Sequence, residues 1–386
     1  MEGKPRYGPV RCGLAAPGSR FSHPKTTGDL FMEASVSILF TPDILARAAE
    51  AFGLQGEPRK LGDFENYLFE LEDREGDPAI LRLTHSSHRS AEQVEEELRW
   101  LRHLAASGLE ADVAACEPAL SGEWVVPLEA ADGSRFYASR FRKAPGARAA
   151  AGPDGWDPAL VREWGAVTGR LHRASASYEA HHPRHHWHEE ELTVSRGQYL
   201  AGEPELLDRF EEVLEELRRL PLADDSYGLI HGDIHQGNFH AHEGKLTVFD
   251  FDDAEYNWFV HDLAIPLYYA LGGAAVQQLP EVEREAYAAA FFQPFYEGYA
   301  SEHELDLDWL DRIGLFMRMR DLVLYTVLAK KLDESEKVGR MADWIAEIRA
   351  RIVAGEPISK LDFRALAAEA AGQPAPAAKA ASERRD

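Results

Sequence analysis

The sequence predicts an α+β protein with two lobes, one rich in strands and one mainly helical. The chain of 386 residues is long enough to bury more than one core. Residues 59–143 contain strand-like runs interrupted by one helix, whereas apolar residues recur at helical spacing beyond residue 157. A stretch rich in Gly, Pro and Ala, residues 142–155, separates the two patterns and is expected to form a hinge.

Changes in composition along the chain indicate the boundaries of the two lobes and of the segments at either end. Residues 1–31 lack hydrophobic periodicity and are expected to be a disordered leader or a wrongly assigned start. The N-terminal lobe is expected at residues 32–143 and the C-terminal lobe at residues 144–362. Residues 363–386, rich in Ala and Pro, are expected to be a disordered tail.

Local signals place the elements of the N-terminal lobe. Thr41 can cap a helix that has Pro42 in its first turn. The runs KLGDFENYLFELED and PAILRLTH favour strands on either side of a turn, and SAEQVEEELRWLRHLAASGL favours a helix that ends at Gly108. GEWVVPLEA and SRFYASRF flank the turn-forming ADGS and predict a hairpin.

Helical signals dominate the C-terminal lobe. Asp157 is expected to cap a helix that carries Pro158 at its first position and an apolar stripe through Leu160, Trp164 and Val167. Further helices are expected at residues 203–220, 281–299, 307–331 and 335–355.

Charge and cysteine content exclude some classes of function. The net charge of −24 disfavours binding to nucleic acid or to anionic membranes. No apolar run approaches the roughly 18 residues of a membrane span. Only Cys12 and Cys116 occur, so no disulfide framework is expected. We therefore expect a cytoplasmic protein that binds neither nucleic acid nor membrane, and the sequence does not indicate its oligomeric state.

The stretch LIHGDIHQGNFHAHEGKLTVFDFDD contains three polar residues in a distinctive order, Asp233, Asn238 and Asp250. YGLI favours a short strand that leads into the first polar cluster. KLTVFDF favours a second strand, with Asp250 and Asp252 on the face that also holds Val248. Carboxylates at the end of an apolar strand are costly unless a cation or hydrogen-bond donors compensate them.

These three residues suit phosphoryl transfer. Asp and Asn supply the hard oxygen ligands with which proteins hold Mg²⁺ beside phosphate groups. With Asn238 and Asp250 assigned to the metal, Asp233 can accept a proton from an attacking hydroxyl. A dinuclear metallophosphoesterase is an alternative for GDIH and GN, but the further spaced His and Asp ligands that it needs are missing.

The segment HGDIHQGN…VFDFDDAEYNWFVHDLA resembles the aminoglycoside phosphotransferase/choline kinase family, and the resemblance extends over roughly residues 40–350. It implies a bilobal protein-kinase-like fold, ATP and Mg²⁺ as cofactors, and a small-molecule hydroxyl as acceptor. It also implies that Asp233 is the catalytic base, that Asn238 and Asp250 bind the metal, and that Asp262 supports the catalytic loop. A Ser/Thr protein kinase and a catalytically silent nucleotide-binding protein are the alternatives.

The helix at SAEQVEEELRWLRHL predicts an ion pair on the nucleotide side. Val94 and Leu98 lie on its apolar face, and Glu97 shares that face. A buried acid needs a cation, and Arg82 in the strand PAILRLTH can supply it. We expect Arg82 and Glu97 to position the nucleotide as the Lys–Glu pair of protein kinases does, with a solvent-exposed Glu97 as the alternative. The remaining charged residues are expected on the exposed side: Glu92, Glu95, Glu96, Arg99 and Arg102.

The resemblance also implies the other nucleotide contacts. LGDFENYLFEL stands where protein kinases have a glycine-rich loop, and Glu65, Asn66 and Tyr67 are expected to cover the phosphates through backbone N–H groups. The adenine is expected against YASRFRKAPG, with backbone groups near Phe141 at its edge.

Several histidines are expected to have structural roles. His172 and His231 are expected to support the catalytic loop. HHPRHHWHEEE, residues 181–191, lacks the spacing of a zinc site. We expect it to be a solvated linker, with a substrate-proximal lid or a metal site as the alternatives.

Four charged residues near the motif have open roles. Asp252 and Asp253 either are solvated or cap a turn, or they help to bind the ion or a cationic acceptor. Arg318 and Arg320 are expected to be a surface pair, with an orientation toward the cleft as the alternative.

Overall fold

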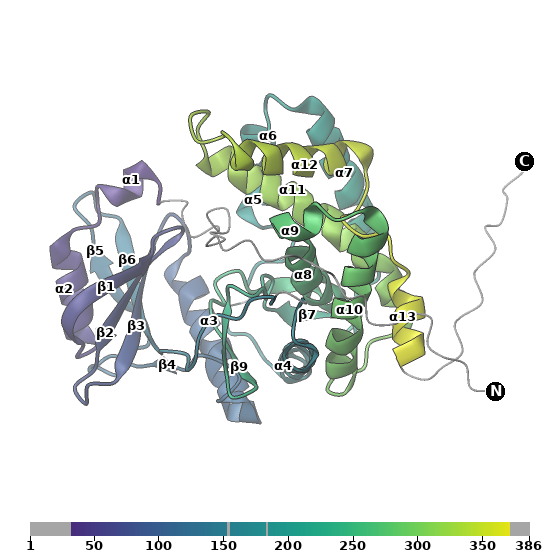
Figure 1. Ribbon diagram of the computed structural model, residues 1–386. Coiled ribbons are helices and arrows are strands. Elements are labelled where there is room, and N and C mark those ends of the chain that lie inside the picture. The colour runs from purple at the N-terminus through teal and green to yellow at the C-terminus, as the bar shows by residue number, and fades with distance from the viewer. Residues whose placement is uncertain (1–31, 153–154, 183, 371–386) are drawn as a thin grey trace, which may run out of the picture.

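The computed structural model describes residues 32–152, 155–182 and 184–370, which form two lobes (Figure 1). The N-terminal lobe is built on a six-stranded sheet with the order β1-β2-β3-β6-β4, in which β5 also pairs with β6. Every pair in this sheet is antiparallel. The strands are β1 (Gln55–Gly62), β2 (Asn66–Glu72), β3 (Pro78–His85), β4 (Cys116–Glu117), β5 (Val126–Glu129) and β6 (Arg135–Arg142).

Three helices accompany the sheet: α1 (Ala34–Ser37), α2 (Pro42–Ala51) and α3 (Ala91–Leu104). The predicted cap of α2 is confirmed, because the Thr41 side chain accepts a hydrogen bond from the backbone of Ile44 at 3.3 Å. Ser90 and Gln93 form a capping box at the start of α3. This helix lies between the sheet and the C-terminal lobe (Figure 1).

The run at residues 60–73 differs from the prediction of one strand. It contains the end of β1, a turn at residues 63–65 and the whole of β2. Lys60 pairs with Asp63 across the start of this turn at 2.6 Å. The chain reverses here because polar residues interrupt the apolar alternation, and the turn points toward the cleft that it lines.

The C-terminal lobe is mainly helical, and four short strands carry its loops. Strand β7 (Tyr227–Ile230) pairs with β10 (Glu255–Trp258), and β8 (Phe239–His242) pairs with β9 (Lys245–Val248). The helices are α4 (Pro158–Ser175), α5 (Glu191–Val194), α6 (Arg196–Tyr199), α7 (Pro204–Arg218), α8 (Phe259–Leu271), α9 (Ala274–Gln277), α10 (Glu281–Ala300), the 3₁₀ helix Leu307–Arg312, α11 (Ile313–Lys331), α12 (Arg340–Ala354) and α13 (Phe363–Ala370).

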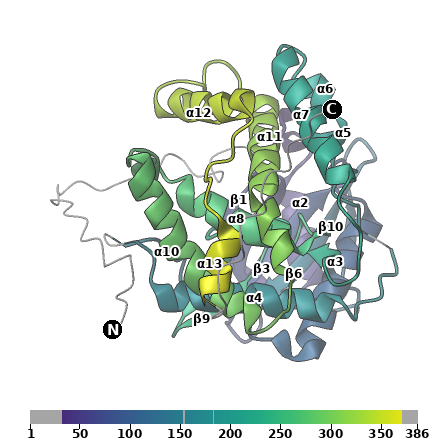
Figure 2. The ribbon, with the colours of Figure 1, turned by 90° about the vertical axis from the view of Figure 1, so that its right-hand side faces the viewer.

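Helices α4 and α10 pack unusually closely (Figure 2). A Cβ atom at Gly165 of α4 would lie 1.8 Å from the backbone oxygen of Phe295 in α10. Only glycine permits this approach, which fixes α4 against α10.

Two hydrophobic clusters form the core. The smaller one joins the sheet to α2 through residues such as Phe52, Leu81 and Phe136. The larger one fills the C-terminal lobe and also contains Leu98 and Trp100 of α3. Helix α3 is therefore attached to the C-terminal core by burial of its apolar face.

The prediction of a disordered tail from residue 363 is wrong for its first eight residues. They form α13, in which Phe363, Ala367 and Ala368 are buried. The Phe363 ring lies 4.9 Å from the ring of Phe292 in α10. The sequence of α13 resembles low-complexity sequence, but its apolar residues recur at helical spacing and pack this helix against α10. The expected leader and residues 371–386 lie outside the described residues. Among the helices of the described ranges, none has the length and apolarity required to cross a bilayer.

Candidate active site

The loop between β7 and β8 carries Asp233 and Asn238, and the segment after β9 carries Asp250. The Asn238 side-chain nitrogen donates to the backbone oxygen of Asp233 at 3.0 Å and lies 3.4 Å from its Oδ2. The backbone N–H of Phe249 donates to the backbone oxygen of Asn238 at 2.9 Å, which places Asn238 beside the residue that precedes Asp250. Asp233, Asn238 and Asp250 all line the same cleft.

A buried carboxylate fixes the backbone of this loop. Asp262, fully buried in α8, accepts hydrogen bonds from the backbone N–H groups of His231 and Gly232, each at 3.0 Å. His172 contacts the same carboxylate at 3.2 Å. Burial alone would raise the pKa of Asp262, but its partners, His172 foremost, hold it below the ordinary value. The predicted supporting positions of Asp262, His172 and His231 are confirmed.

Gly232 is required by the turn that precedes Asp233. Its φ of 82° is in the left-handed region, and a Cβ atom there would lie 2.5 Å from the backbone oxygen of Asp253. Any side chain would push apart the two segments that carry Asp233 and Asp250.

Asp250 differs from the prediction in its backbone. The expected strand ends at Val248, and Asp250 has a φ of 65°, so it does not share a strand face with Val248 and Asp252. A left-handed non-glycine residue is strained and is common at functional sites. Loss of surrounding water within the cleft and the neighbouring Asp252 carboxylate raise the pKa of Asp250 to about 7.

Arg320 of α11 pairs with Asp233, which corrects the expectation of a surface position. One guanidinium nitrogen donates to Asp233 Oδ1 at 2.6 Å and also to the hydroxyl of Tyr269. Burial alone would raise the pKa of Asp233, but Arg320, with His235 3.3 Å away, holds it well below the ordinary value. Arg318 does lie apart from the site, where it pairs with Glu216.

Arg82 and Glu97 form the predicted ion pair. Two guanidinium nitrogens donate to the two Glu97 oxygens at 2.8 and 2.7 Å, and both side chains are buried. Neither residue is among those described residues that line the cleft. The Arg82 fork is occupied by Glu97, so this pair attaches β3 to α3.

Two other predicted nucleotide residues lie in the sheet. Asn66 begins β2, is 8% exposed, lines the cleft and accepts a hydrogen bond from Thr84. Phe141 lies in β6, where its ring is 5.0 Å from the Arg82 guanidinium, and it is not among the described residues that line the cleft. The structure thus brings Asn66 to the cleft and places Phe141 behind it.

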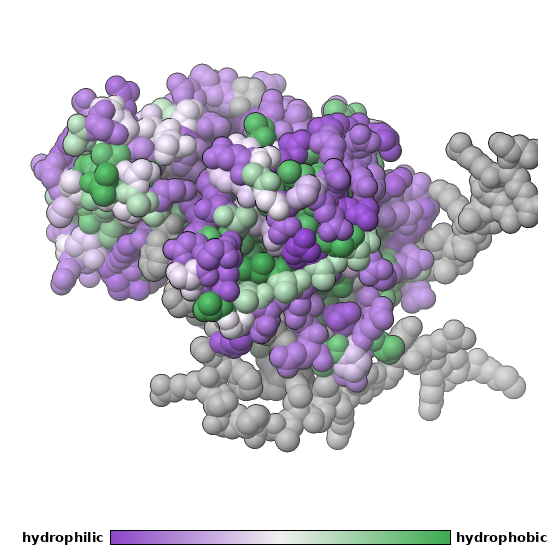
Figure 3. Space-filling model, turned by 90° about the horizontal axis from the view of Figure 1, so that it is seen from above, coloured by the Kyte–Doolittle hydropathy of each residue, from purple (hydrophilic) through white to green (hydrophobic). Residues whose placement is uncertain are grey.

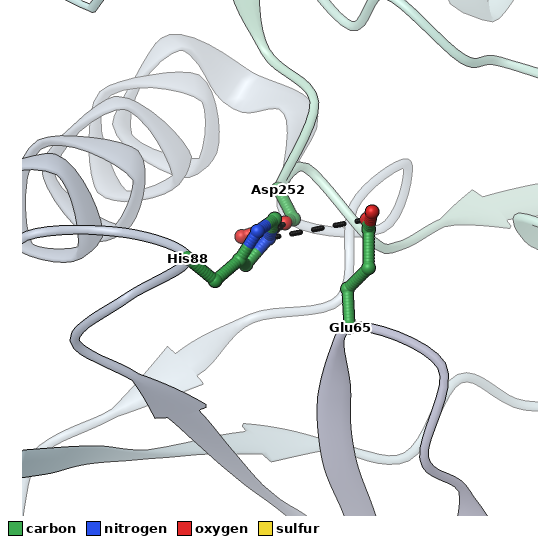
Figure 4. A group of neighbouring side chains, drawn as sticks. All are labelled: Glu65, His88 and Asp252. Atoms are coloured by element: carbon green, nitrogen blue, oxygen red, sulfur yellow. Dashed lines mark hydrogen bonds and ion pairs between the residues drawn. The ribbon is translucent and has the colours of Figure 1, made fainter. Parts of the chain in front are cut away.

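A charged cluster connects the turn at residues 63–65 to the segment after Asp250 (Figure 4). His88 Nε2 lies 2.5 Å from Asp252 Oδ2 and 3.9 Å from Glu65 Oε2. Burial disfavours the charged imidazole, but the Asp252 carboxylate raises the pKa of His88 above its ordinary value. Buried Arg89 lies 3.3 Å from Asp253 and 3.7 Å from Asp252. Asp252 is therefore paired and buried, whereas Asp253 is paired with Arg89 but keeps a side chain that is 46% exposed.

The histidine-rich segment is only partly the solvated linker that was expected. Arg184, 2% exposed, donates to the backbone oxygens of Gln93 in α3, Ala254 and Asp252. It therefore bridges α3 and the segment that follows Asp250. Trp187 is buried as well, whereas His181 and His182 are exposed.

Glu96 is also buried, although the periodicity of α3 alone predicted an exposed position. Its carboxylate accepts hydrogen bonds from Tyr178 and from the backbone N–H groups of His181 and His182. The segment that leads into the histidine-rich region covers this side of α3, which the sequence of the helix cannot reveal.

The cleft has a volume of about 2470 Å³ and extends from the turn at residues 63–65 to α12. Apolar residues gather in the hollowed centre of the molecule, and hydrophilic residues surround them (Figure 3). The part beyond Asp233 is bounded by α8, α10, α11 and α12. Its lining includes both aromatic and acidic side chains, among them Trp187, Tyr269, Trp344, Glu190, Asp253, Glu255, Asp343 and Glu347.

The polar groups around Asp250 fit a hard divalent cation. Asn238 uses its amide nitrogen on Asp233, so its amide oxygen remains for a ligand. Asp252 Oδ1 is buried without a hydrogen-bond partner among the described residues. Oxygen donors of this kind suit Mg²⁺ or Ca²⁺, and a bound cation would favour the ionised form of Asp250.

Comparison with known proteins agrees with this geometry. The family model described as "Phosphotransferase enzyme family" matches residues 58–305. Amicoumacin kinase of Bacillus subtilis (strain 168) is 36% identical over 333 residues, which are 85% of this chain and 97% of that protein. The chain belongs to the phosphotransferase enzyme family.

Solved structures give the same result. Amicoumacin kinase hAmiN, in complex with AMP-PNP, Ca²⁺ and Ami, matches with a TM-score of 0.79 and 31% identity, covering 86% of this chain and 99% of that one. A microcompartment-associated aminopropanol kinase matches with a TM-score of 0.65 and 22% identity, covering 82% and 98%, and supports the fold alone. The family, the kinase-like fold and the activity that the sequence predicts, phosphoryl transfer to a small molecule, are confirmed.

Proposed function

We propose that this phosphotransferase uses ATP with Mg²⁺ and phosphorylates a hydroxyl group of an amine-bearing small molecule. The observation that carries the proposal is the position of Asp233. It lines the cleft between the turn at residues 63–65 and the part that is bounded by α8, α10, α11 and α12. Since ATP and a reducing environment are found in the cytoplasm, we also propose a cytoplasmic location.

In the proposed reaction, Asp233 orients the acceptor hydroxyl. The oxygen of the acceptor hydroxyl attacks the γ-phosphorus of ATP. The bond between the γ-phosphorus and the bridging oxygen of the β-phosphate breaks, and ADP leaves. The hydroxyl proton passes to the Asp233 carboxylate. Because Arg320 keeps that carboxylate ionised, we assign catalysis mainly to orientation and charge stabilisation and less to strong basicity.

Asn238 and Asp250 are the proposed ligands of the divalent cation, and Asp252 is available beside them. When bound, the cation would neutralise charge on the β- and γ-phosphates. Asn66 and the turn at residues 63–65 would cover the phosphates, since they line the same cleft. Arg82 and Glu97 would act indirectly, because their pairing fixes β3 against α3.

The acceptor assignment rests on charge. Acidic side chains lie on both sides of the pocket, with Glu190 and Asp253 near Asp233 and with Asp343 and Glu347 on α12. Such a pocket favours a cationic ligand over a neutral or anionic one. Amicoumacin kinase, which is 36% identical to this chain, is named for a small-molecule acceptor, and this supports a small-molecule acceptor here.

A protein substrate is disfavoured by the segment after Asp250. The strand β10 begins at Glu255 and α8 begins at Phe259, so the described chain leaves no long segment for docking a peptide. All proposed catalytic positions are filled, which also disfavours a silent nucleotide-binding protein.

The proposal is tested by ADP formation with a panel of acceptors in the presence of ATP and Mg²⁺. The panel contains hydroxylated amines, amicoumacin, the same amines blocked by acetylation, neutral sugars and a Ser/Thr peptide. We expect turnover with one or more free amines and at least tenfold lower kcat/KM after acetylation, because one charge-assisted contact is lost. Turnover limited to peptides or sugars would contradict the proposal.

A further inference from the structure

Among the contacts between the two lobes, one lysine holds two parts of the N-terminal lobe at once. Lys331 is the last residue of α11, and its ammonium donates to Glu33 Oε1 at 2.6 Å and to the backbone oxygen of Phe64 at 3.3 Å. The same nitrogen lies 4.9 Å from the centre of the Phe64 ring. One side chain of the C-terminal lobe thus holds two separate parts of the N-terminal lobe.

Burial makes this contact specific. The Lys331 side chain is only 4% exposed, and an ammonium in such a place needs charged and polar partners. Glu33 precedes α1, whose Val36 is buried in the core of the N-terminal lobe. The Glu33 anchor is therefore fixed to that lobe. Burial opposes the charge of Glu33, but Lys331 lowers its pKa, which keeps the pair ionised.

Phe64 contributes the apolar half of the contact. It lies in the turn at residues 63–65, yet its ring packs against the hydrophobic cluster of the C-terminal lobe. A cation over an aromatic ring adds attraction when water is excluded. The turn is thus attached to the opposite lobe by its ring and by its backbone oxygen.

The position of α11 gives this contact a consequence for the reaction. Arg320, which holds Asp233, precedes Lys331 by eleven residues, or about 16 Å along a helix. Helix α11 therefore contacts Asp233 near its middle and the turn at residues 63–65 at its last residue.

We propose that Lys331 is a positioning residue that holds the turn at residues 63–65 closed over the nucleotide. The nucleotide can leave only after this contact breaks, so the contact sets the rate of nucleotide exchange. The inference rests on the proposed function for its nucleotide. Lys331 touches no reacting atom and acts only through Phe64 and Glu33.

The test compares Lys331→Met, which keeps the length of the side chain and removes its charge, with Lys330→Met. Lys330 is the matched control, because it is 22% exposed and its bond of 2.9 Å is to Glu191 in its own lobe, with Glu33 only at 4.0 Å. The first measurement is amide hydrogen exchange of residues 61–67 without nucleotide. The second is the rate at which a fluorescent ADP analogue leaves the enzyme.

We expect Lys331→Met to speed both the exchange of the turn and the release of the analogue by about tenfold, the effect of losing a charge-assisted hydrogen bond. Lys330→Met should change either rate by less than about twofold, as an exposed ion pair contributes little. Glu33→Gln, which removes one partner only, should give a smaller change in the same direction. It also provides the test if Lys331→Met does not fold.

Unchanged exchange of the turn in both Lys331→Met and Glu33→Gln would overturn the inference. Faster exchange of the turn with an unchanged release rate would overturn the role in nucleotide exchange. A wild-type protein that binds no ATP or ADP would refute the proposed function, whereas the exchange data would still decide whether Lys331 holds the turn.

Discussion

Two arginine–carboxylate pairs lie near the proposed reaction site, and they differ in their access to water. The side chains of Arg82 and Glu97 are 3% and 1% exposed, and two hydrogen bonds join them. The side chains of Arg320 and Asp233 are 15% and 14% exposed, and one guanidinium nitrogen makes the contact. The first pair lies behind the sheet surface, whereas Arg320 and Asp233 both line the cleft.

The difference separates a structural pair from an exchangeable one. A fully buried pair loses much more when one partner is removed than it contributes when both are present, because the remaining charge is left without water. A pair at the edge of a cleft can exchange its partner for a ligand or for water. Arg82 and Glu97 are therefore expected to stay together through turnover, whereas Asp233 can pass from Arg320 to the acceptor hydroxyl.

The largest effect on stability is expected from breaking the buried pair. Arg82→Met should lower the free energy of unfolding by roughly 3–5 kcal/mol, since it leaves Glu97 charged and buried. Urea denaturation followed by circular dichroism measures this change. The double variant Arg82→Met/Glu97→Met should recover most of the lost stability. A cost below about 1 kcal/mol for Arg82→Met alone would contradict the burial of this pair, because only solvent-exposed ion pairs contribute so little.

Breaking the cleft pair should affect catalysis more than stability. Arg320→Met is expected to lower kcat about tenfold, because Asp233 loses the donor that fixes its orientation, and to change the free energy of unfolding by only about 1 kcal/mol. Arg320→Lys should retain part of the activity. The control is Arg318→Met, two residues away and paired with Glu216. Equal loss of kcat in Arg318→Met and Arg320→Met would contradict a specific role of the Arg320–Asp233 contact in catalysis.

A third, histidine-based pair provides a pH test of the same comparison. Because Asp252 raises the pKa of His88, the stabilisation from this pair should be fully present below about pH 6.5 and should be lost as the pH rises through the raised pKa. The measurement is the difference in unfolding free energy between wild type and His88→Gln from pH 5.5 to pH 9. A difference that grows with pH would contradict the assignment of a charged His88.

The smallest effect is expected at Tyr269, whose hydroxyl shares the Arg320 nitrogen with Asp233. Tyr269→Phe should change kcat less than about threefold, since the ring stays in place beside the guanidinium at 5.0 Å. A steady-state assay under the conditions of the Arg320 variants decides this. A loss as large as that of Arg320→Met would show that the hydroxyl, and not the guanidinium, holds Asp233.

Much of the fold was predictable because its signals are local. Caps at Thr41 and Asp157, the hairpin at ADGS and the helical spacing after the hinge each depend on a few neighbouring residues. The grouping of Asp233, Asn238 and Asp250 was predictable for the same reason, since these residues lie within one short stretch of sequence. The Arg82–Glu97 pair followed from one acid on an apolar helix face.

The remaining features depend on contacts between distant segments. Arg320 meets Asp233 from 87 residues away, and nothing in RMRDLVLYTVL shows that one of its arginines turns inward. Glu96 is buried by a segment that begins more than 80 residues later. The left-handed backbone of Asp250 has no sequence signal, because the apolar run before it favours a continued strand. Periodicity within one element cannot reveal what another element covers.

The central claim is that Asp233 acts on the acceptor hydroxyl whereas Asp250 binds the metal ion. The direct test compares Asp233→Asn with Asp250→Asn in two assays. The first is Mg²⁺-dependent ATP binding by calorimetry, and the second is single-turnover phosphoryl transfer. We predict that Asp233→Asn binds ATP with the affinity of the wild type, within about twofold, and transfers phosphate roughly 10³-fold more slowly. Asp250→Asn should lose most of the Mg²⁺-dependent affinity as well as the transfer. Transfer at the wild-type rate by Asp233→Asn, or equal loss of ATP affinity in both variants, would contradict the account.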